Sequence, residues 1–352
     1  MTAEHARSWE GSARRVAVLG AGSWGTTFAK VVADAATASG VDRTIRIWGR
    51  RADVVNQINA EHRNEQYLKG ILLPDSITAS TDVAEVLDGA DLVILAVPAQ
   101  TLRPQLRDWK NLIAPDALVV SLMKGLELHT DSRMSEVIRE ELDLPAGRVA
   151  VVSGPNLAME IAREEPTASV VACSESGPAG WMARSCTAPY FRPYTTLDVV
   201  GVEIGGIVKN IIALAVGICE GKQMGDNTKA SVITRGLAET SRLTLALGGE
   251  ARTMAGLAGL GDLVATCSSA LSRNHTAGRL LGTGLTLDQV TAEMTQTAEG
   301  IKSAQAVHEL AGKLGVEMPI TAAVVAVLAG KLHVDQLGPL LLSRDLKPEG
   351  DY

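Results

Sequence analysis

Lys209 is the residue of this sequence best placed for acid–base chemistry. It interrupts the apolar stretch 203–221, whose lack of a polar face at helical spacing predicts a buried helix. A buried ammonium is unfavourable unless it is paired or loses its proton, and a lysine with a lowered pKa can act as a general base. The alternative is a lysine that reaches solvent past a helix end. Its mid-helix position, followed by the uncharged residues 210–219, argues against that alternative.

Other charged residues lie beside apolar or glycine-rich segments. Asp262 follows a run of glycine and apolar residues, which makes it a candidate partner for a buried lysine. Lys124 follows an apolar, strand-like stretch, where it could hold a substrate anion; an ordinary surface lysine is the alternative. The tripeptide 272–274, Ser-Arg-Asn, precedes a helical pattern. That arrangement is expected of a small anion site, or of a plain helix cap with a surface arginine.

A glycine-rich turn near the N-terminus has the spacing of a dinucleotide-binding motif. Gly20, Gly22 and Gly25 fit the pattern GxGxxG between a short apolar strand, 15–20, and a helix. In that context the turn lets a pyrophosphate reach backbone amides at the helix N-terminus. A second strand, 44–48, follows at the distance that a βαβ unit requires. We therefore predict a dinucleotide site rather than a purely structural turn.

The residues after that second strand bear on the choice of dinucleotide. A site selective for NAD usually has an acidic residue there, which binds the ribose 2′-hydroxyl. This chain has Arg50 and Arg51 instead, and arginine suits a 2′-phosphate. We therefore expect NADPH or NADH as cofactor, with NADP accepted or preferred. The alternative is that both arginines are ordinary surface residues at a helix start.

The elements that must carry these residues alternate between strand and helix in the first part of the chain. Further strand-like runs recur at 92–97, 118–122, 148–153 and 168–173. Helical stretches such as 82–87 and 132–142 separate them. The alternation predicts an α/β fold with a parallel, doubly wound, Rossmann-type sheet, in which ligands bind beyond the carboxyl ends of the strands.

After residue 198 only helical patterns continue, at 228–247, 274–281, 286–295, 299–314 and 320–330. We therefore expect an all-α substrate domain to follow the dinucleotide-binding domain. The expected organisation is a flexible tail at 1–13, a dinucleotide-binding domain at 14–197, a helical substrate and catalytic domain at 198–341, and a flexible tail at 342–352.

Composition and charge exclude several classes of protein. The chain has 352 residues, 46% hydrophobic and 21% charged, as in ordinary soluble globular proteins. Its net charge of −7 argues against a nucleic-acid partner. No apolar run reaches the roughly 18 residues of a membrane span, because Lys209 splits the longest one. The N-terminal segment is unlike a signal peptide, and the four scattered cysteines suit reduced packing positions, so we expect a cytoplasmic protein without a metal site.

Nine short motifs occur in order along residues 15–335. They are GAGSWG at 20–25, MKGLE at 123–127, SGPNLAMEIA at 153–162, IGGIVKNIIALAVGI at 204–218, TRGLAE at 234–239, GLGDLVATC at 259–267, SRN at 272–274, AEG at 298–300 and GVEMPI at 315–320. No single motif is specific, but the ordered set is. With these motifs the chain resembles the NAD(P)-dependent glycerol-3-phosphate dehydrogenase family of bacteria.

The resemblance implies hydride transfer between sn-glycerol 3-phosphate and NAD(P), with dihydroxyacetone phosphate as product, and a supply of glycerol 3-phosphate for phospholipid synthesis. Lys209 would take the C2-hydroxyl proton, and Lys124 and Asp262 complete the expected catalytic set. The expected substrate positions are Lys124, Gly154, Asn156, Lys209, Asn210, Asp262, Ser272, Arg273 and Asn274. The expected cofactor positions are Gly20, Gly22, Ser23, Trp24, Gly25, Arg50, Arg51, Lys124, Ala158, Arg273, Thr297 and Glu299.

The chain departs from the family pattern at two places. After SRN the family commonly has a second basic residue and an aromatic, whereas this chain has His275, Thr276 and Ala277, which bears on phosphate affinity. Thr297 stands where an aliphatic residue is commoner, which bears on cofactor packing.

Two other functions share part of these features. A dehydrogenase of hydroxy acids would share the dinucleotide domain and the lysine helix, but not necessarily SRN or GLGDL. A nucleotide-sensing module without turnover would have no use for an isolated lysine in an apolar helix. The sequence leaves open the oligomeric state, with a homodimer as one alternative, and also product inhibition and the physiological direction.

Overall fold

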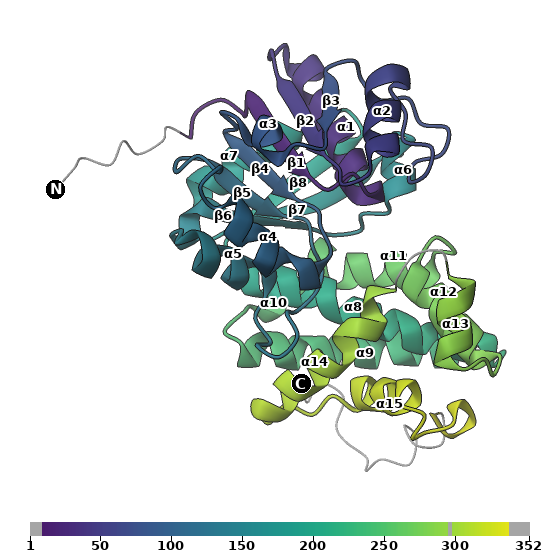
Figure 1. Ribbon diagram of the computed structural model, residues 1–352. Helices are drawn as coiled ribbons and strands as arrows, with labels where there is room; N and C mark the ends of the chain where they lie inside the picture. Colours follow the sequence, from purple (N-terminus) through teal and green to yellow (C-terminus); the bar gives the residue numbers. More distant parts are fainter. Residues whose placement is uncertain (1–8, 295–297, 338–352) are drawn as a thin grey trace. The chain divides into compact units, whose positions relative to one another are not determined.

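The computed structural model describes residues 9–294 and 298–337, which form two compact units (Figure 1). The first unit contains the chain up to Met123 together with Met134–Val199. The second contains Lys124–Arg133 together with the chain from Val200 onwards. Thr297 and the expected tail at 342–352 lie outside the described residues.

An eight-stranded sheet is the centre of the first unit. Its strands are β1 (Arg15–Leu19), β2 (Thr44–Trp48), β3 (Ile77–Ser80), β4 (Leu92–Leu95), β5 (Leu118–Ser121), β6 (Val149–Ser153), β7 (Thr167–Cys173) and β8 (Phe191–Thr196). They lie in the order β3-β2-β1-β4-β5-β6-β7-β8, so the strand order reverses between β1 and β4. Doubly wound sheets bind ligands beyond the strand ends at such a reversal. The chain leaves β1 there and enters the glycine turn at Gly20.

Helices cover both faces of this sheet (Figure 1). They are α1 (Ser23–Ser39), α2 (Ala52–Glu61), α3 (Val83–Leu87), α4 (Leu102–Trp109), α5 (Met134–Leu142), α6 (Ala158–Ala162) and α7 (Ser176–Cys186). Along β1 the side chains alternate between two apolar clusters. Val16 and Val18 pack with Phe28 of α1, while Leu19 packs in the cluster of Trp109 of α4. The buried strands β4 and β5 are typical of a sheet covered on both faces.

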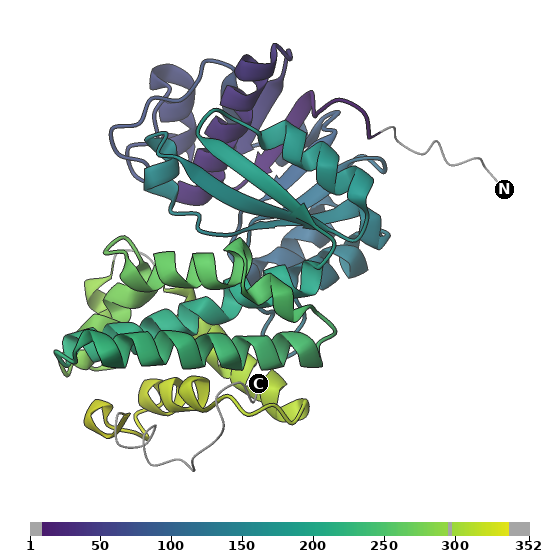
Figure 2. The same cartoon turned by 180° about the vertical axis from the view of Figure 1, so that it is seen from behind.

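The sheet is not parallel throughout, which corrects the expectation from the sequence. β7 runs antiparallel to β6, and β8 runs parallel to β7. The connecting helix α6 has five residues and rises about 7.5 Å, whereas the seven residues of β7 span about 23 Å. So short a helix cannot return the chain along the length of the sheet, and the next strand therefore runs back. Figure 2 shows β7 and β8 as two long teal strands running together.

All six strands predicted from the sequence are present, with ends that differ by at most two residues. Two strands, β3 and β8, were not predicted. β3 is only four residues long, and half of them are polar in type. β8 contains Pro193, which has no amide hydrogen to donate. Proline is tolerated there because β8 is an edge strand.

Part of the N-terminal segment that was expected to be a flexible tail, 1–13, is packed against the first unit. Trp9 lies edge-on to Trp181 of α7, with ring centroids 5.6 Å apart. Arg184 donates hydrogen bonds to the carbonyl oxygens of Trp9 and Gly11, and Ala13 is fully buried. The partly buried ring of Trp9, packed against the apolar cluster of this unit, explains why residues 9–13 are held in place.

The second unit is helical, and its described residues contain no strand, as expected. Its helices are α8 (Val199–Gly221), α9 (Asp226–Ala246), α10 (Ala251–Met254), α11 (Asp262–Ser268), α12 (Arg273–Gly282), α13 (Leu287–Glu293), α14 (Glu299–Lys313) and α15 (Pro319–Leu328). In α8 every residue from Gly201 to Cys219 is buried. This helix is long and apolar enough to cross a membrane, but 89% of its most apolar window is buried inside the protein. It is therefore the core helix of the unit.

Helices α8 and α12 approach each other at backbone distance. A Cβ atom placed on Gly217 or Gly221 of α8 would lie 2.2 Å from a carbonyl oxygen of α12. A Cβ atom on Gly278 of α12 would lie 2.1 Å from the carbonyl oxygen of Leu214. Small residues permit this kind of close helix contact. The contact fixes α12, and with it the tripeptide 272–274, against the second half of α8.

A turn of π-helix, Leu257–Gly261, leads into α11. Such turns are rare and occur frequently at functional sites. Its backbone lies against the first half of α8, because a Cβ atom on Gly205 would be 2.5 Å from the carbonyl oxygen of Ala258. This close contact sets the position of Asp262, the first residue of α11, relative to α8.

The packing of α8 against α12 predicts that Gly278→Ala lowers the free energy of unfolding by about 1–3 kcal/mol or more, because the methyl group must displace backbone. Gly312→Ala is the matched control, since Gly312 lies exposed in α14 with nothing within 4 Å of an added Cβ. It should raise stability by about 0.5–1 kcal/mol through helix propensity. Urea denaturation followed by circular dichroism measures both. If Gly278→Ala and Gly312→Ala unfold with equal free energies, the close contact of the α8 and α12 backbones is contradicted.

Candidate active site

Two lysine side chains of the second unit meet at one carboxylate. Lys209, near the midpoint of α8, forms an ion pair with Oδ1 of Asp262. Lys124 binds the other oxygen, with its Nζ 2.6 Å from Oδ2. The side chains of Lys209 and Asp262 are 9% and 1% exposed. Asp262, the candidate partner of the buried lysine, therefore does pair with Lys209, and both side chains are buried.

Thr266 completes this cluster and was not predicted from the sequence. It lies one turn after Asp262 on α11, and its Oγ1 accepts a hydrogen bond from Nζ of Lys209 at 2.7 Å. The same hydroxyl donates to Oδ1 of Asp262 at 3.3 Å. The signal in the sequence was the i,i+4 spacing of a carboxylate and a hydroxyl, which places both on one helix face. Thr266 thus orients both members of the ion pair.

The position of Lys209 changes its acidity. Burial lowers the pKa of Lys209 to about 7, because the ammonium form loses its hydration. The carboxylate of Asp262 opposes this shift by stabilising the ammonium, and the positive charge of Lys124 adds to it. A lysine with a pKa near neutrality has a substantial unprotonated fraction at pH 7, so it can accept a proton there.

A buried amide pair joins three helices next to this cluster. Asn210 follows Lys209 on α8, and its Oδ1 accepts a hydrogen bond from Nδ2 of Asn274 at 2.9 Å. Oδ1 of Asn274 in turn accepts from the backbone N–H of Gly300 at 2.8 Å. The two asparagines therefore connect α8, α12 and α14. Their expected contact with substrate stays a prediction.

The tripeptide 272–274 starts helix α12. The hydroxyl of Ser272 accepts a hydrogen bond from the N–H of His275 at 3.2 Å, so Ser272 is the N-cap residue. Arg273, the first helical residue, is exposed. His275, at which the chain departs from the family pattern, is buried with its Nε2 3.0 Å from a carboxylate oxygen of Glu220.

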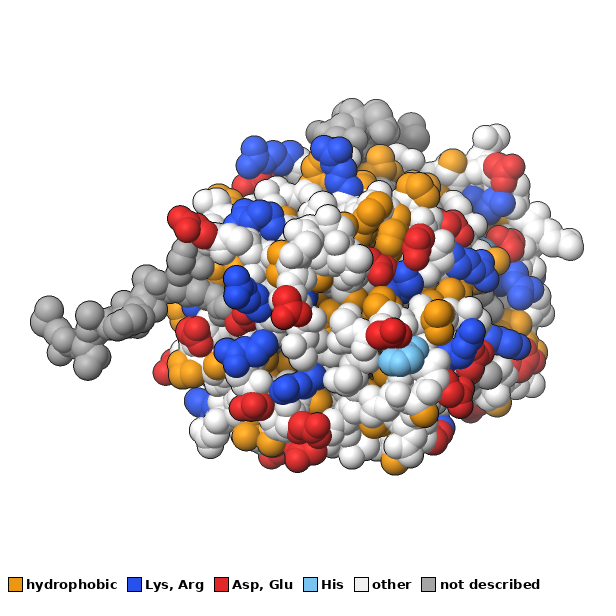
Figure 3. All heavy atoms as spheres, turned by 90° about the horizontal axis from the view of Figure 1, so that it is seen from above, with side chains coloured by type: hydrophobic (Ala, Val, Ile, Leu, Met, Phe, Trp, Pro, Cys, Tyr) orange, Lys and Arg blue, Asp and Glu red, His pale blue; other side chains and the backbone are white. Residues whose placement is uncertain are grey.

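Several positive charges lie within electrostatic reach of Glu299, the first residue of α14. Burial raises the pKa of Glu299, while the charges of Arg273, Lys124 and Lys209 act to lower it. On the face shown in Figure 3, basic and acidic side chains are interspersed. In the second unit, the positive charge near Glu299 comes from a few local side chains, Arg273, Lys124 and Lys209, as an anion site in an acidic protein requires.

The glycine turn of the first unit has the shape of a phosphate cradle. Gly20 has a φ of 130°, and a Cβ atom there would lie 2.4 Å from the carbonyl oxygen of Ala96. A Cβ on Gly25 would lie 2.0 Å from the carbonyl oxygen of Gly20, whereas Gly22 faces open space at the N-cap of α1. Nε1 of Trp24 is buried without a hydrogen-bond partner in the described chain. These features fit a dinucleotide pyrophosphate at the helix N-terminus.

The loop after α2 supports this turn through two side chains. Ser23 donates its hydroxyl to the carbonyl oxygen of Tyr67 at 3.0 Å. Asn64, which is fully buried and was not predicted, donates to the carbonyl oxygen of Ala21 at 3.0 Å and to Oγ1 of Thr26 at 2.9 Å. The side chain of Ser23 is thus used within the protein, and its expected contact with a cofactor stays a prediction.

The two arginines after β2 differ in their surroundings. Arg51 is held by both carboxylate oxygens of Asp53, with Nε 3.0 Å from Oδ1. This ion pair raises the pKa of Arg51 and lowers that of Asp53. Arg50 is exposed, and its side chain makes no ion pair or hydrogen bond with the described residues. Of the two, Arg50 is therefore the one available to bind a phosphate.

The segment after β6 contains an amide without partners. Asn156 has both polar side-chain atoms buried and unpaired within the described residues, which points to a ligand. Gly154 has a φ of 124°, a conformation that favours glycine. Ala158 begins α6, and its carbonyl oxygen accepts a hydrogen bond from Thr27 at 3.2 Å.

Two family models match the chain. The model of the NAD-dependent glycerol-3-phosphate dehydrogenase N-terminus matches residues 15–179, and that of the C-terminus matches residues 198–338. The chain belongs to the NAD-dependent glycerol-3-phosphate dehydrogenase family. This confirms the expected family, the fold class and the assignment as an oxidoreductase that uses a nicotinamide dinucleotide. The hydroxy-acid dehydrogenase and the binding module without turnover are thereby set aside.

Similar proteins of this family span nearly the whole chain. A glycerol-3-phosphate dehydrogenase [NAD(P)+] of Thermobifida fusca is 57% identical over 95% of this chain and 98% of its own length. One of Streptomyces griseus is 55% identical over the same shares. The crystal structure of the glycerol-3-phosphate dehydrogenase of Coxiella burnetii is 37% identical with a TM-score of 0.86, and the match covers 94% of this chain and 98% of that one.

Family membership leaves the roles of single residues as predictions, and the expected residues fall in both units. The first unit contains the glycine turn, Arg50, Arg51, Gly154, Asn156 and Ala158. The second contains Lys124, Lys209, Asn210, Asp262, Ser272, Arg273, Asn274 and Glu299. The structure brings Lys124, Lys209 and Asp262 into direct contact and joins Asn210 to Asn274.

The different surroundings of the two arginines generate a prediction for cofactor choice. Arg50→Ala should raise the KM for NADPH by about 10- to 150-fold, the equivalent of about 1.5–3 kcal/mol for a charge-assisted hydrogen bond, and leave the KM for NADH nearly unchanged. Arg51→Ala also removes one positive charge, but that charge is already neutralised by Asp53. Its effect on the KM for NADPH should therefore be much smaller. Steady-state kinetics with both cofactors test this. Equal losses for NADPH and NADH would show that Arg50 does not bind the 2′-phosphate.

Proposed function

We propose that Lys209 is the general base in the interconversion of sn-glycerol 3-phosphate and dihydroxyacetone phosphate that this chain catalyses with NAD(P). The supporting observation is a buried lysine with a lowered pKa, held by Asp262 and Thr266. Burial of an ammonium opposes folding, so the chemistry of the site accounts for the lysine better than stability does.

In the oxidation direction the unprotonated Nζ of Lys209 takes the proton of the C2 hydroxyl. The electrons of the O–H bond form the carbonyl bond as the C2 hydrogen leaves as hydride. The dinucleotide, when bound, supplies the hydride acceptor. In the reduction direction the protonated Nζ returns its proton to the carbonyl oxygen. Asp262 stabilises the ammonium that forms, and Thr266 keeps Nζ oriented.

The residues of the first unit would hold the dinucleotide. The amides at the start of α1, exposed by Gly22, would bind the pyrophosphate. Arg50 would bind a 2′-phosphate, so NADPH is used at least as well as NADH. The unpartnered indole N–H of Trp24 and the amide of Asn156 would donate hydrogen bonds to the bound molecules.

The phosphate of the substrate would be held by Arg273 and by the first amides of α12. An arginine matches phosphate oxygens with a planar fork of donors, and a helix start adds backbone N–H groups. Ser272 already caps one of these amides, that of His275, so the amides nearer the start of the helix remain for phosphate. Lys124, although paired with Asp262, adds positive charge to the same neighbourhood.

The same proposal places the protein in the cytoplasm, as a source of glycerol 3-phosphate for phospholipid synthesis. It rests on the family and on relatives named for this activity. The proposed chemistry uses groups of one chain with a small-molecule substrate and a dinucleotide. It is compatible with a homodimer.

The proposed role of Lys209 predicts that kcat/KM for glycerol 3-phosphate rises with pH below an apparent pKa near 7 and levels off above it, because the protonated lysine cannot accept a proton. Lys209→Ala should lower turnover by about 10² to 10⁴. Lys209→Arg should be nearly inactive, because guanidinium stays protonated. The absorbance of the reduced cofactor, with dihydroxyacetone phosphate or glycerol 3-phosphate as substrate, measures each rate.

The dissociation constant of NADPH serves as the control, since the proposed cofactor-binding residues of the first unit are intact in both variants. It should stay close to the wild-type value. A Lys209→Arg variant that keeps most of the wild-type kcat would rule out Lys209 as the base.

The proposed phosphate site predicts that Arg273→Ala raises the KM for dihydroxyacetone phosphate by about 10- to 150-fold, from the loss of a charge-assisted contact. Turnover of unphosphorylated dihydroxyacetone, a poor substrate, should change far less. Arg279→Ala, an equal charge change at another exposed position of α12, is the control and should have little effect. If Arg273→Ala harms both substrates equally, the phosphate binds elsewhere.

A further inference from the structure

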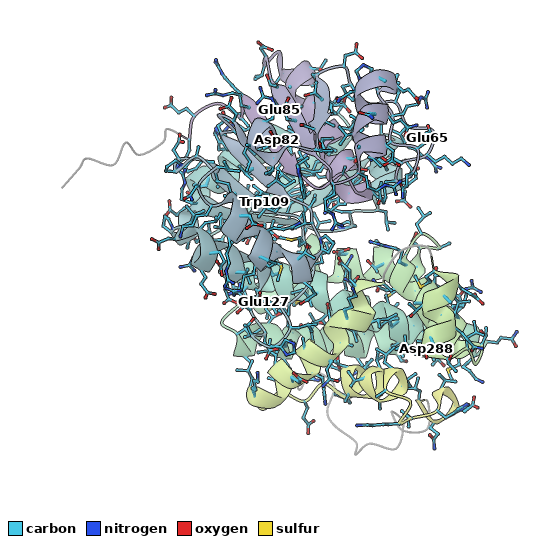
Figure 4. All side chains as sticks on the ribbon, in the orientation of Figure 1. Glu65, Asp82, Glu85, Trp109, Glu127 and Asp288 are labelled. Carbon is cyan, nitrogen blue, oxygen red and sulfur yellow. The ribbon has the colours of Figure 1, made fainter. Side chains whose placement is uncertain are left out.

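The short segment that carries Lys124 forms a closed loop of its own. Residues 124–133 lie between β5 and α5 in the sequence, yet they belong to the second unit. The loop is closed by a bridge between Leu126 and Arg133 and by a hydrogen bond from the N–H of Glu127 to the carbonyl oxygen of Ser132 at 2.9 Å. Glu127, labelled in Figure 4, marks its position. We call residues 124–133 the lysine loop.

The lysine loop is anchored to the helices of the second unit at both of its ends. Leu126 is fully buried in the apolar cluster of α8. Arg133 forms an ion pair with Glu203 of α8, with the atoms 2.7 Å apart and the side chains 14% and 2% exposed. Asp131, also buried, pairs with Lys313 of α14 at 2.5 Å.

A buried ion pair is weak evidence for stability, because desolvation offsets the attraction between the charges. Its better attested effect is to specify one arrangement of the groups that it joins. Glu203 lies less than two turns before Lys209 on α8, and Arg133 ends the loop that begins with Lys124. The pair therefore ties the loop to the helix that carries the proposed base.

We propose that Arg133 and Glu203 are positioning residues, which hold the lysine loop on α8 so that Lys124 remains bound to Asp262 beside Lys209. The proposal rests on the proposed function, because the position of Lys124 matters to the reaction only if Lys209 is the base. Neither Arg133 nor Glu203 takes part in the chemistry. Their effect is exerted through the place of Lys124.

The consequence of this arrangement is electrostatic. The charge of Lys124 lowers the pKa of Lys209, so a loop that moves away raises that pKa. The titratable and hydrogen-bonding groups that face Lys209 or interact with its charge are Asp262, Thr266 and Cys267 of α11, Lys124 of the lysine loop and Glu299 of α14. Among them only Lys124 is carried by the loop, so the other contributions stay in place when the ion pair is removed.

The test uses three variants of the ion pair. Arg133→Met and Glu203→Gln each remove the pair, and Glu203→Gln also keeps the shape of the partner. Arg133→Lys keeps the positive charge and should retain part of the pairing. The control is Lys222→Met, which removes a partly exposed pair with Asp335 just after α8, at the opposite end of that helix from Glu203. Each full-length variant is examined by hydrogen–deuterium exchange of the peptide 124–133 and by the pH dependence of kcat/KM for glycerol 3-phosphate.

In Arg133→Met and Glu203→Gln we expect faster exchange in the lysine loop and a kcat/KM at pH 7 lower by about 10- to 100-fold, as for a misplaced reacting group. The low-pH limb of the kcat/KM profile should move to higher pH by about one unit, because Lys209 loses the positive charge of Lys124 beside it. The KM for NADPH should not change. Arg133→Lys should recover part of the loss, and Lys222→Met should behave as wild type.

Unchanged exchange in the loop would overturn the anchoring by the ion pair. Faster exchange with an unmoved pH limb and an unchanged kcat/KM would overturn the positioning role. If Arg133→Met does not fold, Glu203→Gln, which removes the same ion pair and keeps the shape of the partner, decides in the same way. If Lys209→Arg is active, Lys209 is not the base, and the pH dependence of kcat/KM no longer tests the positioning role. Hydrogen–deuterium exchange of the peptide 124–133 still decides whether Arg133 and Glu203 hold the loop.

Discussion

A lysine stays buried in the middle of an apolar helix only when its charge is compensated or lost, and the second unit is arranged around that requirement. Asp262 supplies one carboxylate to two lysines, so the cluster carries one net positive charge when Lys209 is protonated. Burial lowers the pKa of Lys209, the carboxylate of Asp262 opposes that shift, and the charge of Lys124 adds to it. The balance gives a base near neutrality in a setting that attracts an anion.

Asp262 and Arg273 are placed along α8 by contacts between backbones rather than between long side chains. Gly205 lets the turn before Asp262 lie against one half of α8, and Gly217 and Gly221 let α12 lie against the other half. A backbone contact has almost no freedom to adjust, whereas an interface of flexible side chains can repack. The separation of Asp262 and Arg273 along α8 is therefore determined by glycine positions within a single helix.

Features that depend on local spacing could be predicted from the sequence, and those that depend on distant pairing could not. The glycine turn was predictable because its spacing between a strand and a helix is a local pattern, in which Gly20 and Gly25 have no room for a Cβ atom. Lys209 was predictable because a lone charge in an apolar run is conspicuous. The reversed strand β7 was missed because its direction depends on the length of the preceding connection. The Arg133–Glu203 pair joins residues 70 positions apart, and nothing local marks either one. The packed segment at Trp9 was missed for the same reason, since its partner is Trp181.

The lysine loop also determines how the chain can be divided. Because residues 124–133 belong to the helical unit, the chain passes between the two units three times, after Met123, after Arg133 and after Val199. A fragment that starts at residue 198 lacks Leu126, so its core has a hole, and it leaves Glu203 buried without its arginine. The helical unit therefore cannot be exchanged as one continuous segment. It is encoded by two separate stretches of sequence, and a fusion of this unit to another dinucleotide domain must include residues 124–133 as well as the helices.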